Sequence, residues 1–255
     1  MSIVYLNGTY MPIEQASISP LDRGFLFGDG IYEVIPAYDG RMVGFGPHID
    51  RMIEGLAALE IELNWSHDEW RQVCEQLIER NPAPQVGLYL HVTRGADTKR
   101  HHPYPKGVAP TVFAMPTEIP AAPIPERDKV HAYKVTSMQD QRWQRCNIKS
   151  ISLLGNVMHY QQGYSQGSGE VLLFNSNDEL TECGACNAYI VKKGTVITPA
   201  LDHQILPGIT RLIALGVLRA DGSIPVEERA ITKQEVFDAD EIWISSSSKE
   251  IAPVT

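Results

Sequence analysis

The chain has 255 residues, of which 43% are hydrophobic and 21% charged, and its formal net charge is -9 at pH 7. This length is enough for one large domain or two smaller ones, each with its own core. The negative charge is not offset by any run of Lys or Arg, which argues against a nucleic-acid partner. No apolar run approaches the roughly 20 residues that span a bilayer, and no signal peptide is recognisable. Four cysteines do not make a disulfide framework in a chain this long, so we expect a cytoplasmic protein.

The first half of the chain contains strand and helix signals in turn. Asn7-Gly8 and Asp39-Gly40 are turn dipeptides, and each lies between two strand-like segments. The predicted hairpins pair residues 3–6 with 10–13 and residues 31–38 with 42–45. Hydrophobic periodicity and capping then predict a helix over 49–59, a helix that begins at the Ser66/Glu69 capping box, and a strand over 86–92.

A proline-rich segment divides the chain. Residues 116–125 contain four prolines, which neither a helix nor a central strand accommodates, so we place an interdomain linker at about 114–126. The predicted domains are a smaller N-terminal α/β domain, 1–118, and a larger strand-rich domain, 119–255. In the second domain we expect strands at 130–136, 171–174, 188–191, 196–198 and 241–245, and helices at 151–165, 209–219 and 233–237. The fold class is therefore α+β, in two domains.

Cys183 and Cys186 form a C-x-x-C pair, the spacing of a thiol redox centre or of half a zinc site. A structural zinc site needs four ligands, and the remaining cysteines, Cys74 and Cys146, are isolated. Glu182 directly precedes the pair and would raise a thiolate pKa, which opposes redox activity. We therefore predict no metal and interpret both cysteines as packing residues. A thiol or metal module is the alternative from a different functional class.

Two other residues place a reactive group in an apolar setting. Lys149 lies between Ile148 and the apolar start of a predicted helix, and desolvation favours a neutral amine that can attack a carbonyl. Glu182 lies between a strand and a Gly-Ala turn. Each also has an ordinary interpretation, a lysine whose ammonium reaches solvent and a solvated loop carboxylate.

Four segments have the properties of anion-binding sites. Pro207-Gly208 precedes a predicted helix, and free N–H groups at a helix start attract phosphate. Serines fill positions 245–248 after a strand, and Arg51 can bind a phosphate through two hydrogen bonds. The loop 100–105 combines an arginine and two histidines, a set that suits a carboxylate. An ordinary helix start, a polar turn and surface charges explain the same features when each is taken alone.

The order of these segments resembles the fold-type IV pyridoxal-phosphate enzymes, over essentially the whole chain. The matching motifs are F-G-D-G-I-Y-E-V at 27–34, H-I-D-R at 48–51, R-x-H-x-Y-P at 100–105, I-K-S-x-x-L-L-G-N at 148–156, T-E-x-x-x-x-N at 181–187, L-x-G-I-T-R at 206–211 and S-S-S-S-x-E-I-x-P-V at 245–254. Within this family of aminotransferases, the chain looks most like the D-amino-acid transaminase branch. The family pattern continues beyond Thr255.

The resemblance implies a role for each matched residue. Lys149 corresponds to the catalytic lysine, which forms the internal aldimine with pyridoxal 5'-phosphate and moves the Cα proton. Glu182 corresponds to the carboxylate that keeps the pyridine nitrogen protonated. The implied cofactor-binding residues are Arg51, Lys149, Glu182, Leu206, Ile209, Thr210 and Ser247. The implied substrate-binding residues are Tyr32, Arg100 and His102, of which the last two come from the neighbouring subunit of a homodimer.

The implied reaction is the transamination of D-amino acids with a 2-oxo acid acceptor such as pyruvate or 2-oxoglutarate. A branched-chain L-amino-acid transaminase, an aminodeoxychorismate lyase and an (R)-amine transaminase have the same fold and are the alternatives. All three would share Lys149, Glu182 and the phosphate site, so only the substrate loops discriminate between them. The R-x-H loop favours the D-amino-acid interpretation.

The substrate loop has two possible registers. The segment after Arg94 is one residue longer than the family pattern, so Lys99 with His101 could take the place of Arg100 with His102. We prefer Arg100 with His102, because this register keeps the following Tyr-Pro pair in step with the family pattern. Cys183 and Cys186 stand where small or hydroxylated residues are common in the family.

Overall fold

The structure is a computed structural model that describes residues 2–126 and 128–255. It divides into two compact units. Unit 1 comprises the residues up to Ala121 together with Ile148–Leu153, and unit 2 comprises Ala122–Asn147 and Leu154–Thr255. The sequence predicted two continuous domains, 1–118 and 119–255. Residues 148–153 lie in the second predicted range but belong to unit 1.

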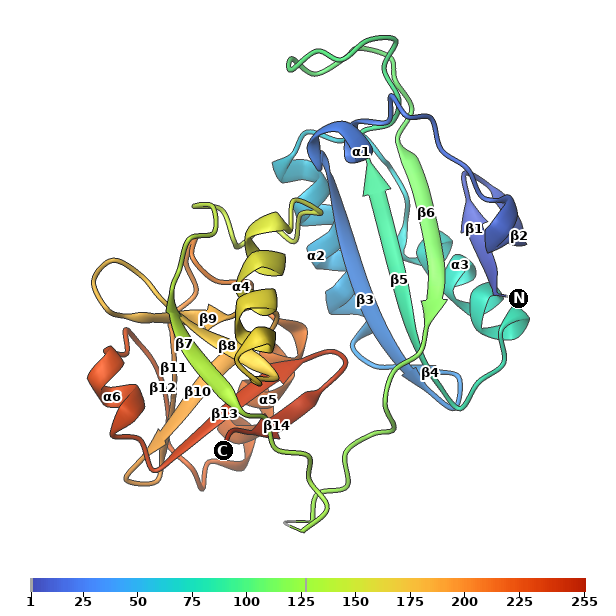
Figure 1. Ribbon diagram of the computed structural model, residues 1–255. Helices are drawn as coiled ribbons and strands as arrows, with labels where there is room; N and C mark the ends of the chain where they lie inside the picture. Colours follow the sequence, from blue (N-terminus) through green and yellow to red (C-terminus); the bar gives the residue numbers. More distant parts are fainter. Residues whose placement is uncertain (1, 127) are drawn as a thin grey trace. The chain divides into compact units, whose positions relative to one another are not determined.

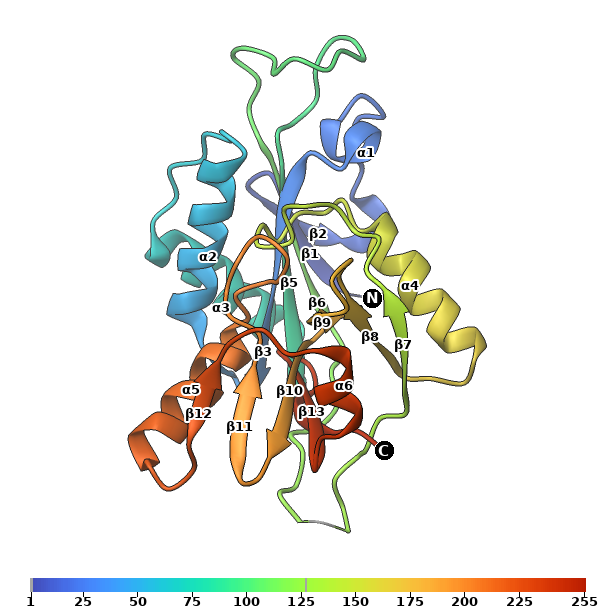
Figure 2. The same cartoon turned by 90° about the vertical axis from the view of Figure 1, so that its left-hand side faces the viewer.

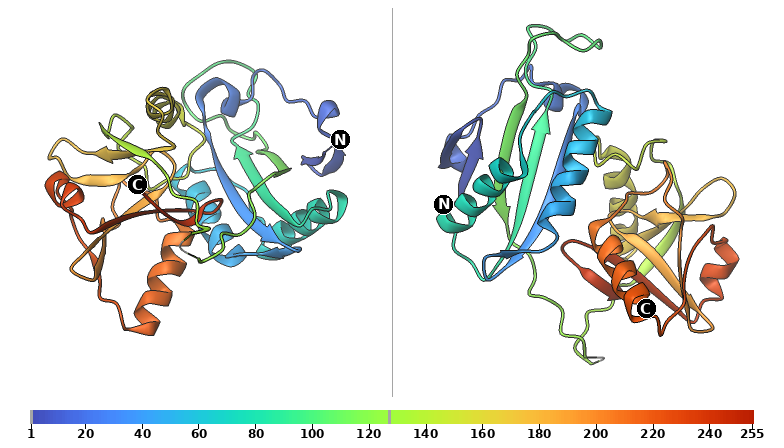
Figure 3. Two further views of the ribbon diagram at one scale, coloured as in Figure 1. Left: turned by 60° about the horizontal axis from the view of Figure 1, so that its bottom comes forward. Right: turned by 180° about the vertical axis from the view of Figure 1, so that it is seen from behind.

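Unit 1 is built on a six-stranded antiparallel sheet (Figure 1) with the strand order β2-β1-β6-β5-β3-β4. The strands are β1 (Ile3–Leu6), β2 (Thr9–Pro12), β3 (Gly30–Tyr38), β4 (Arg41–Met42), β5 (Gln85–Thr93) and β6 (Thr111–Thr117). The helices are α1 (Arg23–Phe27), α2 (Phe45–Ala58) and α3 (His67–Arg80), with a short 3-10 turn η1 (Ile13–Gln15). Helices α2 and α3 lie over the same face of the sheet, as the right-hand view of Figure 3 shows.

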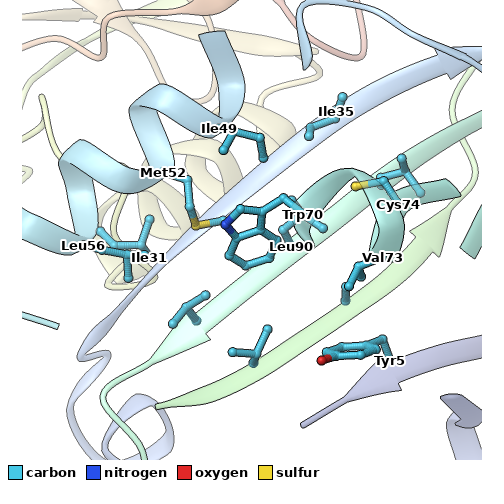
Figure 4. Packing of buried hydrophobic residues seen from close by; sticks show 14 of the residues in the cluster. Tyr5, Ile31, Ile35, Ile49, Met52, Leu56, Trp70, Val73, Cys74 and Leu90 are labelled. Atoms are coloured by element: carbon cyan, nitrogen blue, oxygen red, sulfur yellow. The ribbon is translucent and has the colours of Figure 1, made fainter. Parts of the chain in front are cut away.

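The core of unit 1 lies between this face and the two helices. Trp70 of α3 is fully buried and packs among Ile49 and Met52 of α2 and Ile31 and Leu90 of the sheet (Figure 4). Burying such side chains contributes about 1.5–3 kcal/mol each. Because strand residues alternate between faces, Ile31 and Ile35 point toward the helices, and the residue between them, Glu33, points the same way.

Local signals account for most elements of unit 1. The Asn7-Gly8 hairpin and the Ser66/Glu69 capping box are both present as predicted. The strand predicted at 42–45 is too long: β4 ends at Met42, because Gly44 adopts the left-handed conformation and caps α2.

The start of the predicted linker is also wrong, since residues 114–117 belong to β6. Strand β1 pairs with β6 only at Phe113 and Ala114. Pro116 pairs with Leu88 of β5 on one side and has no β1 partner on the other, so its missing N–H breaks no hydrogen bond to β1.

Unit 2 contains two sheets and three helices. The five-stranded sheet has the order β12-β11-β10-β13-β14, and the three-stranded sheet has the order β7-β8-β9. The strands are β7 (Val135–Gln139), β8 (Glu170–Phe174), β9 (Leu180–Cys183), β10 (Asn187–Lys192), β11 (Thr195–Thr198), β12 (Val226–Glu228), β13 (Glu241–Ser246) and β14 (Glu250–Pro253). The helices are α4 (Leu154–Ser165), α5 (Ile209–Asp221) and α6 (Lys233–Phe237). Helix α4 packs on the three-stranded sheet and α5 on the five-stranded one (Figure 2).

The predicted strand at 130–136 is displaced in the structure. Val130 and Lys129 donate backbone hydrogen bonds to Glu126 in a turn, so the strand begins only at Val135. The helices at 209–219 and 233–237 are confirmed, the second with its Thr232/Glu235 capping box. Within the described part of the chain, no helix has both the length and the apolar character that a membrane crossing requires.

Candidate active site

Lys149 is attached to strand β3 of unit 1. The Lys149 carbonyl accepts a hydrogen bond from the Tyr32 N–H at 3.1 Å, and the Ile151 N–H donates to the Gly30 carbonyl at 3.0 Å. The Lys149 Nζ lies 4.2 Å from the centre of the Tyr32 ring. No carboxylate among the described residues lies within ion-pair distance of this amine. The lysine therefore meets an aromatic face rather than a counter-charge, which leaves its amine available to a carbonyl.

Arg51 of α2 is held by Glu33 of β3. The Arg51 Nε donates to Glu33 Oε1 and its Nη2 donates to Glu33 Oε2, both at 2.7 Å. His48 Nδ1 lies 2.7 Å from the same Oε2. Burial raises the pKa of Glu33, but Arg51 and His48 outweigh it and lower the pKa to about 2. The guanidinium is thus fixed in a buried, fully ionised pair.

Glu33 was not predicted as a site residue. The alternation of buried and half-buried positions along β3 was the signal that could have identified it, since Glu33 shares the inward face with Ile31 and Ile35. An inward carboxylate requires a cation, and the neighbouring helix contains Arg51.

Glu182 is buried at the end of β9 in unit 2, at 6% exposure. Its Oε1 accepts a hydrogen bond from Arg142 Nη1. Its Oε2 accepts from the Leu206 N–H at 3.0 Å and from Asn187 Nδ2 at 3.3 Å. Burial raises the pKa of Glu182, while the adjacent Arg142 opposes the rise. The carboxylate is therefore oriented by three donors and electrostatically coupled to one cation.

Arg142 has a second carboxylate partner, Asp140. Arg142 Nη2 donates to Asp140 Oδ2 at 2.6 Å and its Nε to Asp140 Oδ1 at 3.0 Å. The Thr181 hydroxyl also donates to Asp140, at 2.8 Å. Asp140, Arg142 and Glu182 thus form a row of alternating charges in unit 2. Asp140 and Arg142 were not predicted as site residues, because neither stands in a segment with a recognisable pattern.

The start of helix α5 has the features of an anion site. Gly208 is the N-cap, and none of the described side chains caps this helix. A Cβ at Gly208 would lie 2.0 Å from Asn187 Oδ1, so only glycine fits here. The first-turn N–H groups, which include those of Ile209 and Thr210, have no partner within the helix, and the dipole adds partial positive charge. This arrangement suits a phosphate.

The serines of 245–248 differ in their surroundings. The Ser245 hydroxyl lies 2.8 Å from the Tyr189 hydroxyl in the interior, so it is already engaged. Ser247 lies in the turn that connects β13 to β14 and is half-buried. Of the two, Ser247 is the more exposed.

The predicted substrate trio is not assembled by the contacts within unit 1. Arg100 and His102 both lie against the Phe27 ring, at 5.0 Å from the Arg100 Cζ and 5.4 Å between ring centres. Among the described residues, no hydrogen bond, ion pair or ring contact joins either of them to Tyr32. The loop between β5 and β6 extends beyond the ends of these strands (Figure 1). Arg23 of α1 holds this loop by donating to the carbonyls of His101 and His102.

Cys183 and Cys186 are both free thiols and both buried. Burial raises the pKa of Cys183 and raises that of Cys186 to about 12, with neighbouring acidic groups acting in the same direction. A redox thiol needs the opposite shift. The described part of the chain contains no cluster of three or more metal-ligating side chains.

Comparison with known proteins identifies the family. The sequence profile described as amino-transferase class IV matches residues 30–255. The chain belongs to the class IV aminotransferases. It is 36% identical over 256 residues to a D-alanine aminotransferase of Listeria monocytogenes, covering 99% of this chain and 86% of that protein. It is also 36% identical over 252 residues to a D-alanine aminotransferase of Bacillus licheniformis, covering 99% and 87%.

Solved structures share this fold at low sequence identity. The branched-chain amino acid aminotransferase of Escherichia coli superposes with a TM-score of 0.90 at 20% identity, covering 99% of this chain and 85% of that one. A hypothetical aminotransferase from Mycobacterium tuberculosis, in a PLP-bound form, superposes with a TM-score of 0.85 at 22% identity, covering 99% and 90%. These likenesses confirm the α+β, fold-type IV architecture expected from the sequence.

Aminotransferases of class IV use pyridoxal 5'-phosphate, and the residues present here fit that cofactor. Lys149 offers an amine with no counter-charge among the described residues, and Glu182 offers a buried carboxylate. The uncapped start of α5 offers N–H donors for a phosphate. The chemistry of the three groups matches the aldehyde, the pyridine nitrogen and the phosphate of the cofactor.

Proposed function

We propose that this protein transfers the amino group of D-amino acids to 2-oxo acids, a reaction of the type D-alanine plus 2-oxoglutarate giving pyruvate plus D-glutamate. The main support is the similarity to D-alanine aminotransferases over 99% of the chain. The amine of Lys149, which faces the Tyr32 ring, provides the group that such a reaction requires. Pyridoxal 5'-phosphate, when bound, supplies the aldehyde that exchanges amino groups and the ring that accepts electrons.

Different residues of the chain bind different parts of the cofactor. Glu182 holds a proton on the pyridine nitrogen, because its carboxylate is oriented by Arg142 and the Leu206 N–H. Leu206 packs against the ring. Ile209 and Thr210 donate backbone N–H groups to the phosphate.

Two further residues complete the binding of the phosphate. Arg51, whose orientation Glu33 fixes, provides the positive charge. Ser247 provides a hydroxyl from the turn between β13 and β14. A buried dianion needs several fixed hydrogen-bond donors and a positive charge. The N–H groups at a helix start, a guanidinium and a hydroxyl provide them.

Lys149 then moves the proton of the reaction. The free Nζ would remove the proton from the substrate Cα and would return it to the carbon of the cofactor's aldehyde group. The Tyr32 ring below the amine limits the positions that the Nζ can adopt. A D-amino acid is processed when its Cα–H bond points toward Lys149, so the substrate carboxylate must be fixed on one side.

Tyr32, Arg100 and His102 bind that carboxylate. Tyr32 is contributed by the same subunit as Lys149, and Arg100 and His102 are contributed by the neighbouring subunit of a homodimer. This assignment is consistent with the absence of any contact between Tyr32 and either loop residue among the described residues of unit 1. Helix α4 provides a second argument for a dimer, because it exposes an apolar set, Leu154, Val157, Met158 and Tyr164.

We place the enzyme in the cytoplasm, where its four free thiols stay reduced.

The decisive experiment is a panel of D- and L-amino acids assayed with pyruvate and 2-oxoglutarate as acceptors. We expect turnover of D-alanine with 2-oxoglutarate and little or none of L-alanine. Preferential turnover of L-leucine or L-valine would instead identify a branched-chain enzyme. Turnover of amines that lack a carboxylate would identify an (R)-amine transaminase, and repeated release of pyruvate from aminodeoxychorismate without an acceptor would identify a lyase.

A further inference from the structure

Four residues of unit 2 contact one another through their side chains and the Lys249 backbone N–H, beside the turn that connects β13 to β14. We call them the Glu170 cluster: Glu170, Cys186, Ser246 and Lys249. The Lys249 Nζ lies 3.7 Å from Glu170 Oε2, and the Cys186 thiol donates to the same oxygen at 3.3 Å. Ser246 is a hydrogen-bond partner of Cys186, and its hydroxyl also accepts from the Lys249 N–H at 3.2 Å.

The cluster is built around a buried charge. The Glu170 side chain has no exposed surface, and only 15% of the Lys249 side chain is exposed. The Lys249 Nζ also lies 5.3 Å from the centre of the Tyr133 ring. Burial alone would lower the pKa of Lys249, but the surrounding acidic groups outweigh it and raise the pKa, so the lysine stays charged. Removing one partner of such a buried ion pair strongly destabilises the protein, because the other charge stays buried without compensation.

The C-G-A-C segment has a function in this cluster. Cys186 provides the thiol donor to Glu170. Gly184 provides space, because a Cβ at that position would lie 2.9 Å from Glu170 Oε1. The raised pKa of Cys186, about 12, keeps the thiol protonated and therefore able to donate. The thiol thus acts as a hydrogen-bond donor and not as a nucleophile.

The cluster fixes the turn that contains Ser247. Ser246 and Lys249 stand on either side of Ser247 and Ser248, and their side chains both reach the cluster. Glu170 belongs to β8 of the three-stranded sheet, whereas the turn belongs to the five-stranded sheet. The Lys249–Glu170 pair therefore joins the two sheets of unit 2 at the turn with Ser247.

We propose that Lys249 is a positioning residue, which acts through Glu170 to hold the Ser247 turn in the geometry that binds the cofactor phosphate. This inference rests on the proposed function, in which Ser247 binds that phosphate. A turn that is already ordered loses little freedom when the ligand binds, so its hydrogen bonds contribute more to affinity. Removing the lysine weakens the binding of the phosphate and leaves the binding of the pyridine ring unchanged.

The test compares two ligands that differ only in the phosphate. The full chain, freed of cofactor, is titrated with pyridoxal 5'-phosphate and separately with pyridoxal, and each dissociation constant is measured from the quenching of tryptophan fluorescence. The ratio of the pyridoxal constant to the pyridoxal 5'-phosphate constant measures the contribution of the phosphate. We expect Lys249→Gln to lower this ratio about tenfold, which corresponds to about 1.4 kcal/mol. Lys249→Arg, which keeps the charge, should retain most of the ratio.

A matched control is available in the same unit. Lys233 also pairs with a carboxylate, Asp178, at 3.8 Å and also lies near an aromatic ring, Phe174, at 5.4 Å. Lys233→Gln should leave the ratio unchanged. Because Lys249→Gln leaves Glu170 buried without its cation, Cys186→Ser and Cys186→Val provide an independent pair. The serine keeps a donor and should preserve the ratio, whereas the valine should lower it.

The outcomes separate this inference from the proposed function. If wild-type protein prefers pyridoxal 5'-phosphate and Lys249→Gln shows the same preference, the positioning role is wrong and the proposed function is unaffected. An equal loss of affinity for both ligands also overturns the positioning role, since it indicates a general structural role for the lysine. If wild-type protein shows no preference for the phosphorylated ligand, the phosphate site itself is wrong, and both proposals are overturned.

Discussion

Arg142 and Glu182 form a buried ion pair, in which Arg142 Nη1 donates to Glu182 Oε1. The same guanidinium binds Asp140 through two further hydrogen bonds. Burial raises the pKa of Glu182, Arg142 and the Leu206 N–H lower it, and Asp140 raises it. This balance determines whether Glu182 is ionised and thus able to hold a proton on a pyridine nitrogen.

The first prediction concerns pH dependence. Arg142→Gln removes the cation that lowers the pKa of Glu182, so this pKa rises and the carboxyl group is neutral up to a higher pH. We expect the acidic limb of the kcat/KM profile to move to higher pH. Asp140→Asn removes a like charge and should move the limb in the opposite direction. A shift of the same sign in both variants would contradict the proposed coupling.

The second prediction concerns the substrate carboxylate. Arg100→Ala should raise the KM for D-alanine about ten- to a hundredfold, because it removes a charge-assisted hydrogen bond of roughly 1.5–3 kcal/mol. The dissociation constant of the cofactor should change little. Lys99→Ala is the matched control for the alternative register. If the lysine variant shows the large effect and the arginine variant does not, the register with Lys99 and His101 is correct.

The third prediction concerns the stability of unit 1. The pKa of Glu33 is about 2 in the folded protein, against an ordinary value of 4.5. Because the folded pKa is the lower one, the stabilisation is complete above about pH 4.5 and disappears as the pH falls toward 2. Linkage gives about 3 kcal/mol for a shift of this size. Urea unfolding of Glu33→Gln should lack this acid-dependent component, whereas Glu126→Gln, at an exposed ion pair, should retain it.

The fourth prediction concerns the homodimer. Val157 and Met158 of α4 are 58% and 64% exposed in the isolated chain. Val157→Asp should place a charge in the proposed subunit contact and halve the mass measured by light scattering. Gln162→Asp, on the same helix and also exposed, introduces the same charge and should leave the mass unchanged. A wild-type protein that is already monomeric would reject the shared active site.

Much of the fold follows from local sequence. The Asn7-Gly8 hairpin and the Ser66/Glu69 capping box were predicted correctly, because each depends on residues within a few positions of one another. Strand β6 was not predicted, and its last residues were assigned to the linker because of Pro116, which is tolerated here since β1 no longer pairs with β6 at this position. That pairing joins residues more than a hundred positions apart, and no local pattern indicates it.

The site shows the same division. Lys149 and Glu182 stand in recognisable segments, and the resemblance to a known family assigned their roles. Their partners were not predicted, because the partners of buried charges are distant in sequence: Arg142 lies 40 residues from Glu182. The C-x-x-C pair is the opposite case: its pattern is easy to recognise, but the raised pKa values of both thiols oppose the redox function that the pattern indicates.

The most direct test of the account is to identify the lysine that carries the cofactor. Holoenzyme is reduced with borohydride, which fixes pyridoxal phosphate covalently to the amine that holds it, and the modified peptide is mapped by mass spectrometry. We expect a single modified residue, Lys149, and no cofactor absorbance band in Lys149→Ala protein. Modification of another lysine, such as Lys249, or a band that persists in Lys149→Ala, would contradict the account.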